Sequence, residues 1–327
     1  MRLFFDTLIL IGILSTALPA VILLYHRVKT KKSWEYQHKK FSLIISLLLL
    51  LFTTIFLYGS FIEPRMLIIN EQTVDLKNID NPIKIAFFSD SQIGKYRDET
   101  DVKRTVEKIL KLNPDIVFIG GDVVDNSVIN QKKGIDETLY LTPLSELTKK
   151  IPVYAINGNH EFGVNCQTQD YPCTFYFPDV RLYVQEKMEL LGVRYLVNEL
   201  EKITVRDQSF YLYGGDTWWG DQTDFSILNK RDNEDIPTIA LIHNPAAAWE
   251  TNKNKIDLML SGHTHGGQIR LPLVGPVGLV DDIIARSWYQ GWQELDQMKL
   301  FVTSGNGETG VRARLFNPPE IVLITIN

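Results

Sequence analysis

Two long uncharged segments, residues 7–25 and 41–62, dominate the hydrophobic pattern near the N-terminus. A helix needs about 20 apolar residues to cross a bilayer, because its backbone polar groups cannot stay unpaired in hydrocarbon. The second segment is therefore predicted to be a transmembrane helix rather than a buried core helix. The first, which contains Pro19, is predicted to be another. A signal peptide is its alternative, but one arginine precedes the segment and no good cleavage site follows it.

From residue 83 onward, short apolar runs alternate with segments of helical periodicity. A membrane hairpin over residues 1–69, a linker over residues 70–82 and a domain over residues 83–327 are expected. Helices are predicted over residues 99–113 and near 136–149. Strands are predicted at 83–90, 115–122, 151–159, 209–216, 238–244, 256–263, 299–307 and 320–327. Strands and helices that alternate early and give way to strands predict an α/β fold with two packed sheets.

The charges are divided unevenly along the chain. Residues 1–69 carry an excess of five positive charges and the remainder an excess of ten negative charges, which gives the net charge of −5. The basic segment HRVKTKKSWEYQHKK lies between the two apolar segments, and the positive-inside rule places such a short loop in the cytoplasm. The chain is thus predicted to cross the cell membrane twice, with its domain outside the cytoplasm. An acidic domain without a basic block also argues against nucleic acid as the partner.

The chain has two cysteines, Cys166 and Cys173, and both lie in the polar segment NCQTQDYPCTF. Free cysteines tend to be buried, and no core is expected here. A disulfide that closes this short loop is predicted, which requires an oxidising compartment; two unrelated free thiols are the alternative. A zinc site has little support, because no further ligand lies close by in sequence.

Residues that can bind a metal follow several of the predicted strands. They are Asp90, Asp122, Asn159, His160, His243, His263 and His265. All four histidines of the expected domain are among them, and ligands of α/β proteins gather beyond the carboxyl ends of strands. Carboxylates favour Mg²⁺ or Mn²⁺, whereas imidazoles favour Mn, Fe or Zn. The pattern therefore predicts divalent cations held by oxygen and nitrogen donors.

These residues stand in an ordered set of motifs, and with it the chain resembles the calcineurin-like metallophosphoesterases. The family pattern is D-x-H, G-D-x-x-D, G-N-H-[DE], a lone histidine and G-H-x-H. The chain has Asp90-Ser91-Gln92, GDVVD at 121–125, GNHE at 158–161, His243 in LIHNP and GHTH at 262–265. The match spans residues 83–327. The sequence SGHTHGGQIRLP and the membrane segments further resemble the membrane-associated, exported branch of the family.

The resemblance implies a four-layer sandwich of two mixed β-sheets flanked by helices, and a site for two metal ions, with Mn favoured over Fe, Zn or Mg. One metal takes Asp90, Asp122 and His265, and the other takes Asn159, His243, His263 and the bridging Asp122. It further implies that a bridging hydroxide attacks phosphorus. The resemblance also implies that His160 faces the substrate, as general acid or as a hydrogen-bond donor to the phosphate. Asp125 is implied to act next to the metal ligands without binding a metal itself.

Gln92 is the departure from the family pattern, which usually has histidine as a ligand of the first metal at this position. A glutamine amide offers a neutral oxygen instead, which favours Mn²⁺ or Mg²⁺. The alternatives are a water in place of the side chain, or an inactive site.

The substrate is expected to be a small phosphate mono- or diester, and the membrane segments favour one derived from lipid or cell envelope. Arg270 and Arg286 are the substrate-binding candidates, since arginine can hold a phosphate bidentately; Arg312 and Arg314 are weaker ones. One rival is a cytoplasm-facing pyrophosphatase of a nucleotide-linked lipid such as UDP-diacylglucosamine, which needs the opposite topology. The other is a catalytically silent metal-binding sensor.

Overall fold

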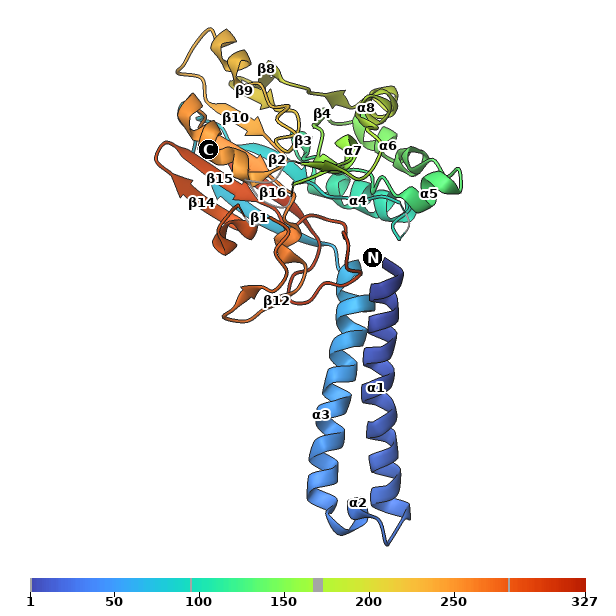
Figure 1. The fold of residues 1–327 in the computed structure, drawn as a ribbon. Helices are drawn as coiled ribbons and strands as arrows, with labels where there is room; N and C mark the ends of the chain where they lie inside the picture. The colour runs from blue at the N-terminus through green and yellow to red at the C-terminus, as the bar shows by residue number, and fades with distance from the viewer. Residues whose placement is uncertain (1, 95, 167–172, 282) are drawn as a thin grey trace.

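The computed structural model describes residues 2–94, 96–166, 173–281 and 283–327, and its N-terminal part is a helical hairpin that projects from a globular domain (Figure 1). α1 (Arg2–Lys29) and α3 (Lys39–Leu57) run antiparallel and are joined through the short α2 (Trp34–Gln37). A π-helical turn η1 (Tyr58–Ile62) and a 3₁₀ turn η2 (Glu63–Arg65) continue α3 into the domain. α1 extends beyond the predicted segment 7–25 at both ends, whereas α3 begins two residues before the predicted segment 41–62 and η1 completes it.

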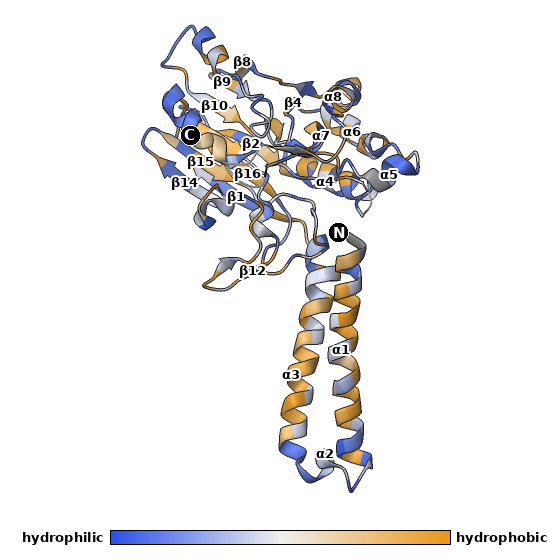
Figure 2. Cartoon of the chain, in the orientation of Figure 1, coloured by the Kyte–Doolittle hydropathy of each residue, from blue (hydrophilic) through white to orange (hydrophobic). Residues whose placement is uncertain are grey.

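The two long helices are mostly apolar, as the hydropathy colours show (Figure 2), and most of their apolar side chains are exposed. Their mutual contact uses small and hydroxyl residues. Thr53 Oγ1 donates a hydrogen bond to Thr16 Oγ1 over 2.8 Å, and a Cβ at Gly12 would come within 3.0 Å of the Phe56 ring. Such contacts are typical of helices that pack in lipid. Both helices are long and apolar enough to cross a membrane.

The domain contains two six-stranded sheets. The first has the spatial order β1-β16-β2-β3-β4-β7, in which only β16 and β2 run antiparallel to each other. Its strands are β1 (Ile68–Val74), β16 (Glu320–Ile326), β2 (Ile83–Phe88), β3 (Ile116–Ile119), β4 (Val153–Ala155) and β7 (Arg194–Tyr195). The second has the order β14-β15-β11-β10-β9-β8, with antiparallel pairs at its two edges. Its strands are β14 (Gly291–Leu295), β15 (Met298–Val302), β11 (Leu258–Ser261), β10 (Thr238–Leu241), β9 (Gln208–Gly214) and β8 (Glu199–Val205).

The main core lies between the two sheets. In β2, Ile85 and Phe87 face Leu260 and Phe301 of the second sheet, while Ala86 points to the other side, because successive strand side chains alternate. There the helices α4 (Glu99–Leu112), α6 (Leu144–Thr148) and α8 (Arg181–Leu190) cover the first sheet. Shorter helical segments, including η4 (Phe225–Lys230) and α9 (Ala248–Thr251), cover the outer face of the second. The predicted two-sheet sandwich flanked by helices is confirmed.

Small elements complete the domain. They are α5 (Val128–Lys132), α7 (Asn159–Phe162), η3 (Glu137–Leu141), η5 (Pro245–Ala247), η6 (Asn252–Asn254), η7 (His265–Gly267), η8 (Arg286–Tyr289), and the hairpins β5 (Val164–Asn165) with β6 (Thr174–Phe175) and β12 (Arg270–Leu271) with β13 (Gly275–Pro276).

Two sequence expectations need correction. Part of the segment expected to be a linker over residues 70–82 lies in the sheet, because β1 pairs in parallel with the last strand along its whole length and buries Val74. The helix expected near 136–149 is two short pieces, η3 and α6. Pro143 stands between them and has no N–H to continue the hydrogen bonding of the first piece.

Candidate metal centre

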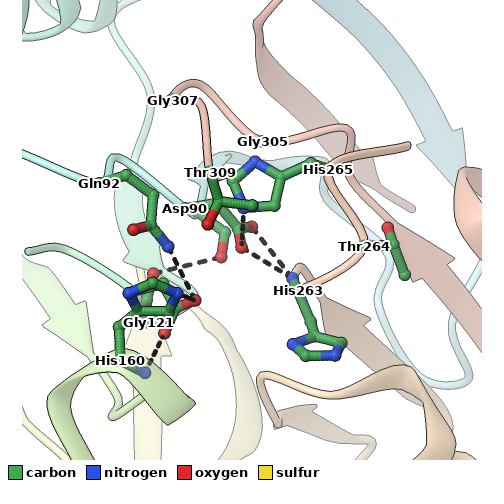
Figure 3. A network of polar contacts seen from close by, with 12 residues as sticks. Asp90, Gln92, Gly121, His160, His263, Thr264, His265, Gly305, Gly307 and Thr309 are labelled. Atoms are coloured by element: carbon green, nitrogen blue, oxygen red, sulfur yellow. Dashed lines mark hydrogen bonds and ion pairs between the residues drawn. The ribbon is translucent and has the colours of Figure 1, made fainter. Parts of the chain in front are cut away.

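The predicted metal-binding residues follow strands of both sheets. Asp90, Asp122 and Asn159 come after β2, β3 and β4 of the first sheet, and His243 and His263 come after β10 and β11 of the second. The carboxyl ends of these parallel strands meet at one edge of the sandwich. Figure 3 shows the side chains of Gln92, His160, His263 and His265 grouped around Asp90.

The backbone at this edge adopts conformations that side chains other than glycine rarely take. The φ angles are +59° at Asp90, +51° at Asp122, +70° at His263 and +49° at both Gln92 and His265. A positive φ is uncommon outside glycine, and such strain gathers at functional sites. The strands therefore end in tight turns, and these turns direct the predicted metal-binding side chains toward one another.

Two motif glycines are required by close approach to the carboxylates. A Cβ at Gly262 would lie 2.2 Å from Asp90 Oδ2, and a Cβ at Gly158 would lie 2.1 Å from Asp122 Oδ1. Any side chain there would displace the acidic group. The glycines before Asn159 and His263 thus allow the two loops to pack against the aspartates.

Asp90, Asp122 and His265 form a buried group that could hold one metal ion. Each offers a ligand atom, and these atoms lie within 4.8 Å of one another. His265 Nε2 is 3.4 Å from Asp90 Oδ1, and the Asp90 carboxylate accepts hydrogen bonds from the backbone N–H of His263. These three residues are the set that the family resemblance implies for the first metal.

Asn159, His243 and His263 lie beside this group. His243 Nε2 is 3.1 Å from Asp122 Oδ2, and His263 Nδ1 is 3.0 Å from Asn159 Oδ1. His243 Nδ1 donates to the carbonyl oxygen of Gly120 over 2.7 Å, which fixes the ring and leaves Nε2 toward the carboxylates. The structure brings together the second implied set, with Asp122 between the two groups.

Gln92 belongs to the same buried cluster. Its Nε2 donates a hydrogen bond to Asp122 Oδ2 over 3.0 Å. Its Oε1 is buried and has no hydrogen-bond partner among the described residues. The glutamine therefore contacts the central carboxylate and has an unused oxygen beside it.

The electrostatics reflect several ionisable groups in one buried space. Burial raises the pKa of Asp90 to about 6. Burial would also raise the pKa of Asp122, but His243 and His160 hold it below its usual value. Burial opposes the charged form of His243, yet Asp122 and Asp90 raise its pKa to about 10. Burial and the neighbouring His243 lower the pKa of His263 to about 3, so this imidazole is neutral and can offer a lone pair to a cation.

The donor set fits divalent metal ions. Gln92 Oε1, His263 Nε2 and His265 Nδ1 are buried atoms without a hydrogen-bond partner among the described residues. Unsatisfied buried polar atoms are costly and rare in folded proteins, and the three side chains that carry them lie around the buried Asp90 (Figure 3). A cation would satisfy the lone pairs of unprotonated ring nitrogens and of the amide oxygen together.

His160 differs from the other three site histidines in being partly exposed. Its backbone N–H donates to Asp122 Oδ1 over 2.9 Å, and its Nδ1 donates to the carbonyl oxygen of Asp125 over 3.0 Å. Nε2 is then the free ring atom, 4.0 Å from Asp122 Oδ2. Burial lowers the pKa of His160, but Asp122 and Asp125 outweigh it and raise the value. The main-chain carbonyl of Asp125 thus orients the ring.

Glu161 is a site residue to which the sequence reading gave no role. Its carboxylate is fully buried and accepts hydrogen bonds from the backbone N–H groups of Asp122, Val123, Val124 and Gly158 over 2.7–3.1 Å. It joins the loop after β3 to the loop after β4. Its place in the GNHE motif was the available signal, and its contacts show that it positions Asp122.

The arginine candidates lie in different surroundings. Arg270 is half-buried, and its Nη1 donates to the carbonyl oxygen of Gly266; Arg286 is exposed on η8. Arg314 is fully buried and donates to the carbonyl oxygens of Ser304 and Gly307, beside Asp90. Arg314 therefore holds the loop behind the carboxylate, and Arg312 lies over the rings of Phe61 and Tyr96 at the end of the helical hairpin.

A cavity of about 120 Å³ adjoins the cluster. Besides the polar cluster, its walls include Phe177, Trp219, Val280 and Thr309. The Trp219 ring meets the His263 ring edge-on at 4.3 Å. Cys166 and Cys173 are joined by a disulfide, and both pack with Trp219 of this wall.

Comparison with known proteins agrees with this geometry. The sequence model of the calcineurin-like phosphoesterases matches residues 83–267. The chain is similar to the metallophosphoesterase YkuE of Bacillus subtilis, with 26% identity over 82% of this chain and 88% of that protein. It is similar to the phosphodiesterase YaeI of Escherichia coli, with 26% identity over 82% of this chain and 92% of that protein.

The chain is also similar to a cattle protein whose name mentions a membrane. It is a transmembrane protein with a metallophosphoesterase domain, 27% identical over 75% of this chain. This chain spans about half of its length, as the match covers 53% of that protein.

Proposed function

Since the chain belongs to the calcineurin-like phosphoesterase family, we propose that it is a membrane-anchored hydrolase of phosphate mono- or diesters that uses two divalent metal ions. It is a metal-dependent phosphoric ester hydrolase by family. One observation carries the proposal: Asp90, Asp122 and His265 bring ligand atoms within 4.8 Å of one another in a buried space, beside the side chain of Gln92, whose buried oxygen has no hydrogen-bond partner among the described residues.

The metal ions would be held in two groups that share Asp122. Asp90, His265 and Gln92 would complete one group, and Asn159, His243 and His263 would complete the other. The neutral oxygens of Gln92 and Asn159 favour Mn²⁺ over softer ions. When bound, the metals would supply Lewis acidity at the phosphoryl oxygens and a nucleophile at neutral pH.

His160 would supply the proton that the leaving oxygen needs. The Asp125 carbonyl accepts the hydrogen bond from Nδ1, so Nε2 is the atom that gives or takes a proton. The neighbouring carboxylates raise the pKa of His160 and favour its charged form, which can donate to a phosphate oxygen. Glu161 would keep Asp122 in place by holding the backbone of residues 122–124.

The membrane part of the proposal has its own support. The two apolar helices, the basic segment between them and the disulfide are consistent with two crossings and a domain outside the cytoplasm. A substrate from lipid or cell envelope fits this location.

The test uses the purified full chain, loaded with Mn²⁺, on p-nitrophenyl phosphate and bis-p-nitrophenyl phosphate. Asp122→Ala should lower turnover by about 1,000-fold or more, because it removes the shared ligand at the charged centre, and metal analysis should show lost metal. Asp296→Ala is the matched control. This exposed aspartate lies in the turn between β14 and β15, so the change should keep full turnover. A wild-type protein that holds two Mn²⁺ and cleaves neither ester would contradict the proposal and favour the silent sensor.

A further inference from the structure

The segment LPLVGPVGLV, residues 271–280, exposes apolar side chains without any charged or hydrogen-bonding side chain among them. It includes the turn and the return strand of the β12–β13 hairpin. Its exposed members are Leu271, Leu273, Val274, Val277, Leu279 and Val280. We call these six residues the apolar hairpin surface. A contiguous exposed apolar surface of this kind marks a contact with a protein or a membrane.

The tip of the hairpin has an unfavourable residue for a turn in water. Leu273 is fully exposed and has a φ of +68°, where glycine or asparagine is normally found. The turn is closed by a hydrogen bond from Val274 N–H to the Leu271 carbonyl oxygen over 3.1 Å. The leucine therefore serves neither the core nor the turn, which indicates a contact outside the domain.

The base of the hairpin lies at the end of the second long helix. Arg314 N–H donates to the Gly59 carbonyl oxygen over 2.8 Å, and Arg270 N–H donates to the carbonyl oxygen of the next residue, Leu315, over 2.9 Å. The two neighbouring residues Arg314 and Leu315 therefore connect η1 to the first strand of the hairpin through backbone hydrogen bonds. Figure 1 shows it projecting from the body on the side from which α1 and α3 leave, beside their upper turns.

The charges around this base suit a lipid headgroup layer. Arg65 is exposed at the end of η2, and Arg312 is half-buried over Phe61. The carboxylate residue Glu308 lines a pocket with both arginines. Phe61 and Phe316 are exposed at the same junction. Apolar side chains flanked by arginines are the composition of elements that lie in the membrane interface, where arginine meets anionic headgroups.

We propose that the apolar hairpin surface enters the leaflet in which α3 ends, as a second membrane contact of the domain. The occupant is the lipid bilayer, because the surface lies next to the end of the helical hairpin at which α3 joins the domain. The proposal rests on the membrane anchorage in the proposed function and is independent of catalysis.

Docking would also place the metal centre relative to the bilayer. His265 and Arg270 stand at the two ends of the loop that leads into the hairpin, and a Cβ at Gly267 would lie 2.4 Å from the Pro276 Cβ, so the hairpin packs tightly on that loop. Val280 belongs both to the apolar hairpin surface and to the cavity wall. A hairpin held in the leaflet therefore holds the cavity at the membrane surface.

The test compares three exposed leucines of the full chain in phosphatidylcholine–phosphatidylglycerol nanodiscs. Leu273→Cys, Leu48→Cys and Leu182→Cys are each labelled with bimane; Cys166 and Cys173 are paired in a disulfide and do not compete. Leu48 lies in α3, and Leu182 lies in α8 on the domain. Doxyl groups at carbon 5 or carbon 12 of the lipid then quench labels near the headgroups or near the bilayer centre.

The label at residue 273 should be quenched by 5-doxyl lipid at least threefold more than the label at residue 182. The label at residue 48 should be quenched most by 12-doxyl lipid. Equal quenching at 273 and 182, with residue 48 quenched, overturns the hairpin proposal and leaves the anchorage standing. Absence of quenching at residue 48 overturns the anchorage instead. Val277→Cys, also on the exposed hairpin, repeats the measurement if the first variant does not fold.

Discussion

The metal centre and the β12–β13 hairpin depart from the usual distribution of polar and apolar groups in opposite directions. At the metal centre, polar atoms of Gln92, His263 and His265 are buried without hydrogen-bond partners in the described part of the chain. In the hairpin, apolar side chains from Leu271 to Val280 are exposed without a cover. Folded proteins normally pair buried polar atoms and limit exposed apolar patches.

The difference between the two regions indicates which kind of partner each requires. Lone pairs around two buried carboxylates require cations, whereas a charge-free apolar surface requires an apolar medium. The two regions are also adjacent, because one loop runs from His265 into the hairpin. The two departures are therefore joined by one short loop, and each can be tested separately.

After the loss expected for Asp122→Ala, the next largest effect is expected at the partly exposed histidine of the metal centre. His160→Ala should lower turnover by about 100- to 1,000-fold, the usual contribution of a general acid. Its metal content should not change, because its Nδ1 is engaged by the Asp125 carbonyl. Steady-state rates and metal analysis of the same preparation check both parts.

A matched control for this variant is His38→Ala, at a histidine between the two long helices and far from the site in sequence. It should keep turnover and metal content. Loss of bound metal in His160→Ala would show instead that His160 is a ligand, and the division between buried ligands and an exposed proton donor would be wrong.

A smaller effect is expected at the departure from the family pattern. Gln92→His should shift the preference of the site from Mn²⁺ toward Zn²⁺ by roughly tenfold, because imidazole favours the softer ion over an amide oxygen. Competitive loading with both ions, followed by metal analysis, measures the ratio. An unchanged ratio would mean that the buried Gln92 oxygen does not face the metal, and that its contact with Asp122 is its only role.

The sequence predicts the site better than it predicts the surroundings of the site. Asp90, Asp122 and His265 could be grouped because each follows a strand in a known motif. The structural role of Arg314 could not, because its carbonyl partners belong to a loop that only the folded chain brings beside Asp90. The place of β1 in the first sheet could not be predicted for a similar reason, because its partner strand lies at the other end of the chain.

The two-sheet sandwich was predictable because buried strands are short apolar runs with clear turns between them. The hairpin surface was not. The run from Leu271 to Val280 is as apolar as a core segment, and only its exposure in the structure shows that no part of the described domain covers it. Hydrophobicity alone does not state which medium a segment faces.

The smallest effect is expected at the tip of the hairpin, and its sign distinguishes the two explanations of Leu273. Leu273→Asn should stabilise the detergent-solubilised chain by about 0.5–1 kcal/mol, because asparagine tolerates a positive φ better than leucine does. The same change at Leu182, in the first turn of α8, is the control and should not stabilise the chain, because its backbone is helical and asparagine has the lower helix propensity. Urea unfolding followed by tryptophan fluorescence measures both. A destabilised Leu273→Asn would mean that the leucine contributes to packing within the protein; a stabilised one shows that the chain keeps, at its tip, a residue that is worse for folding, as expected if the bilayer is what that residue contacts.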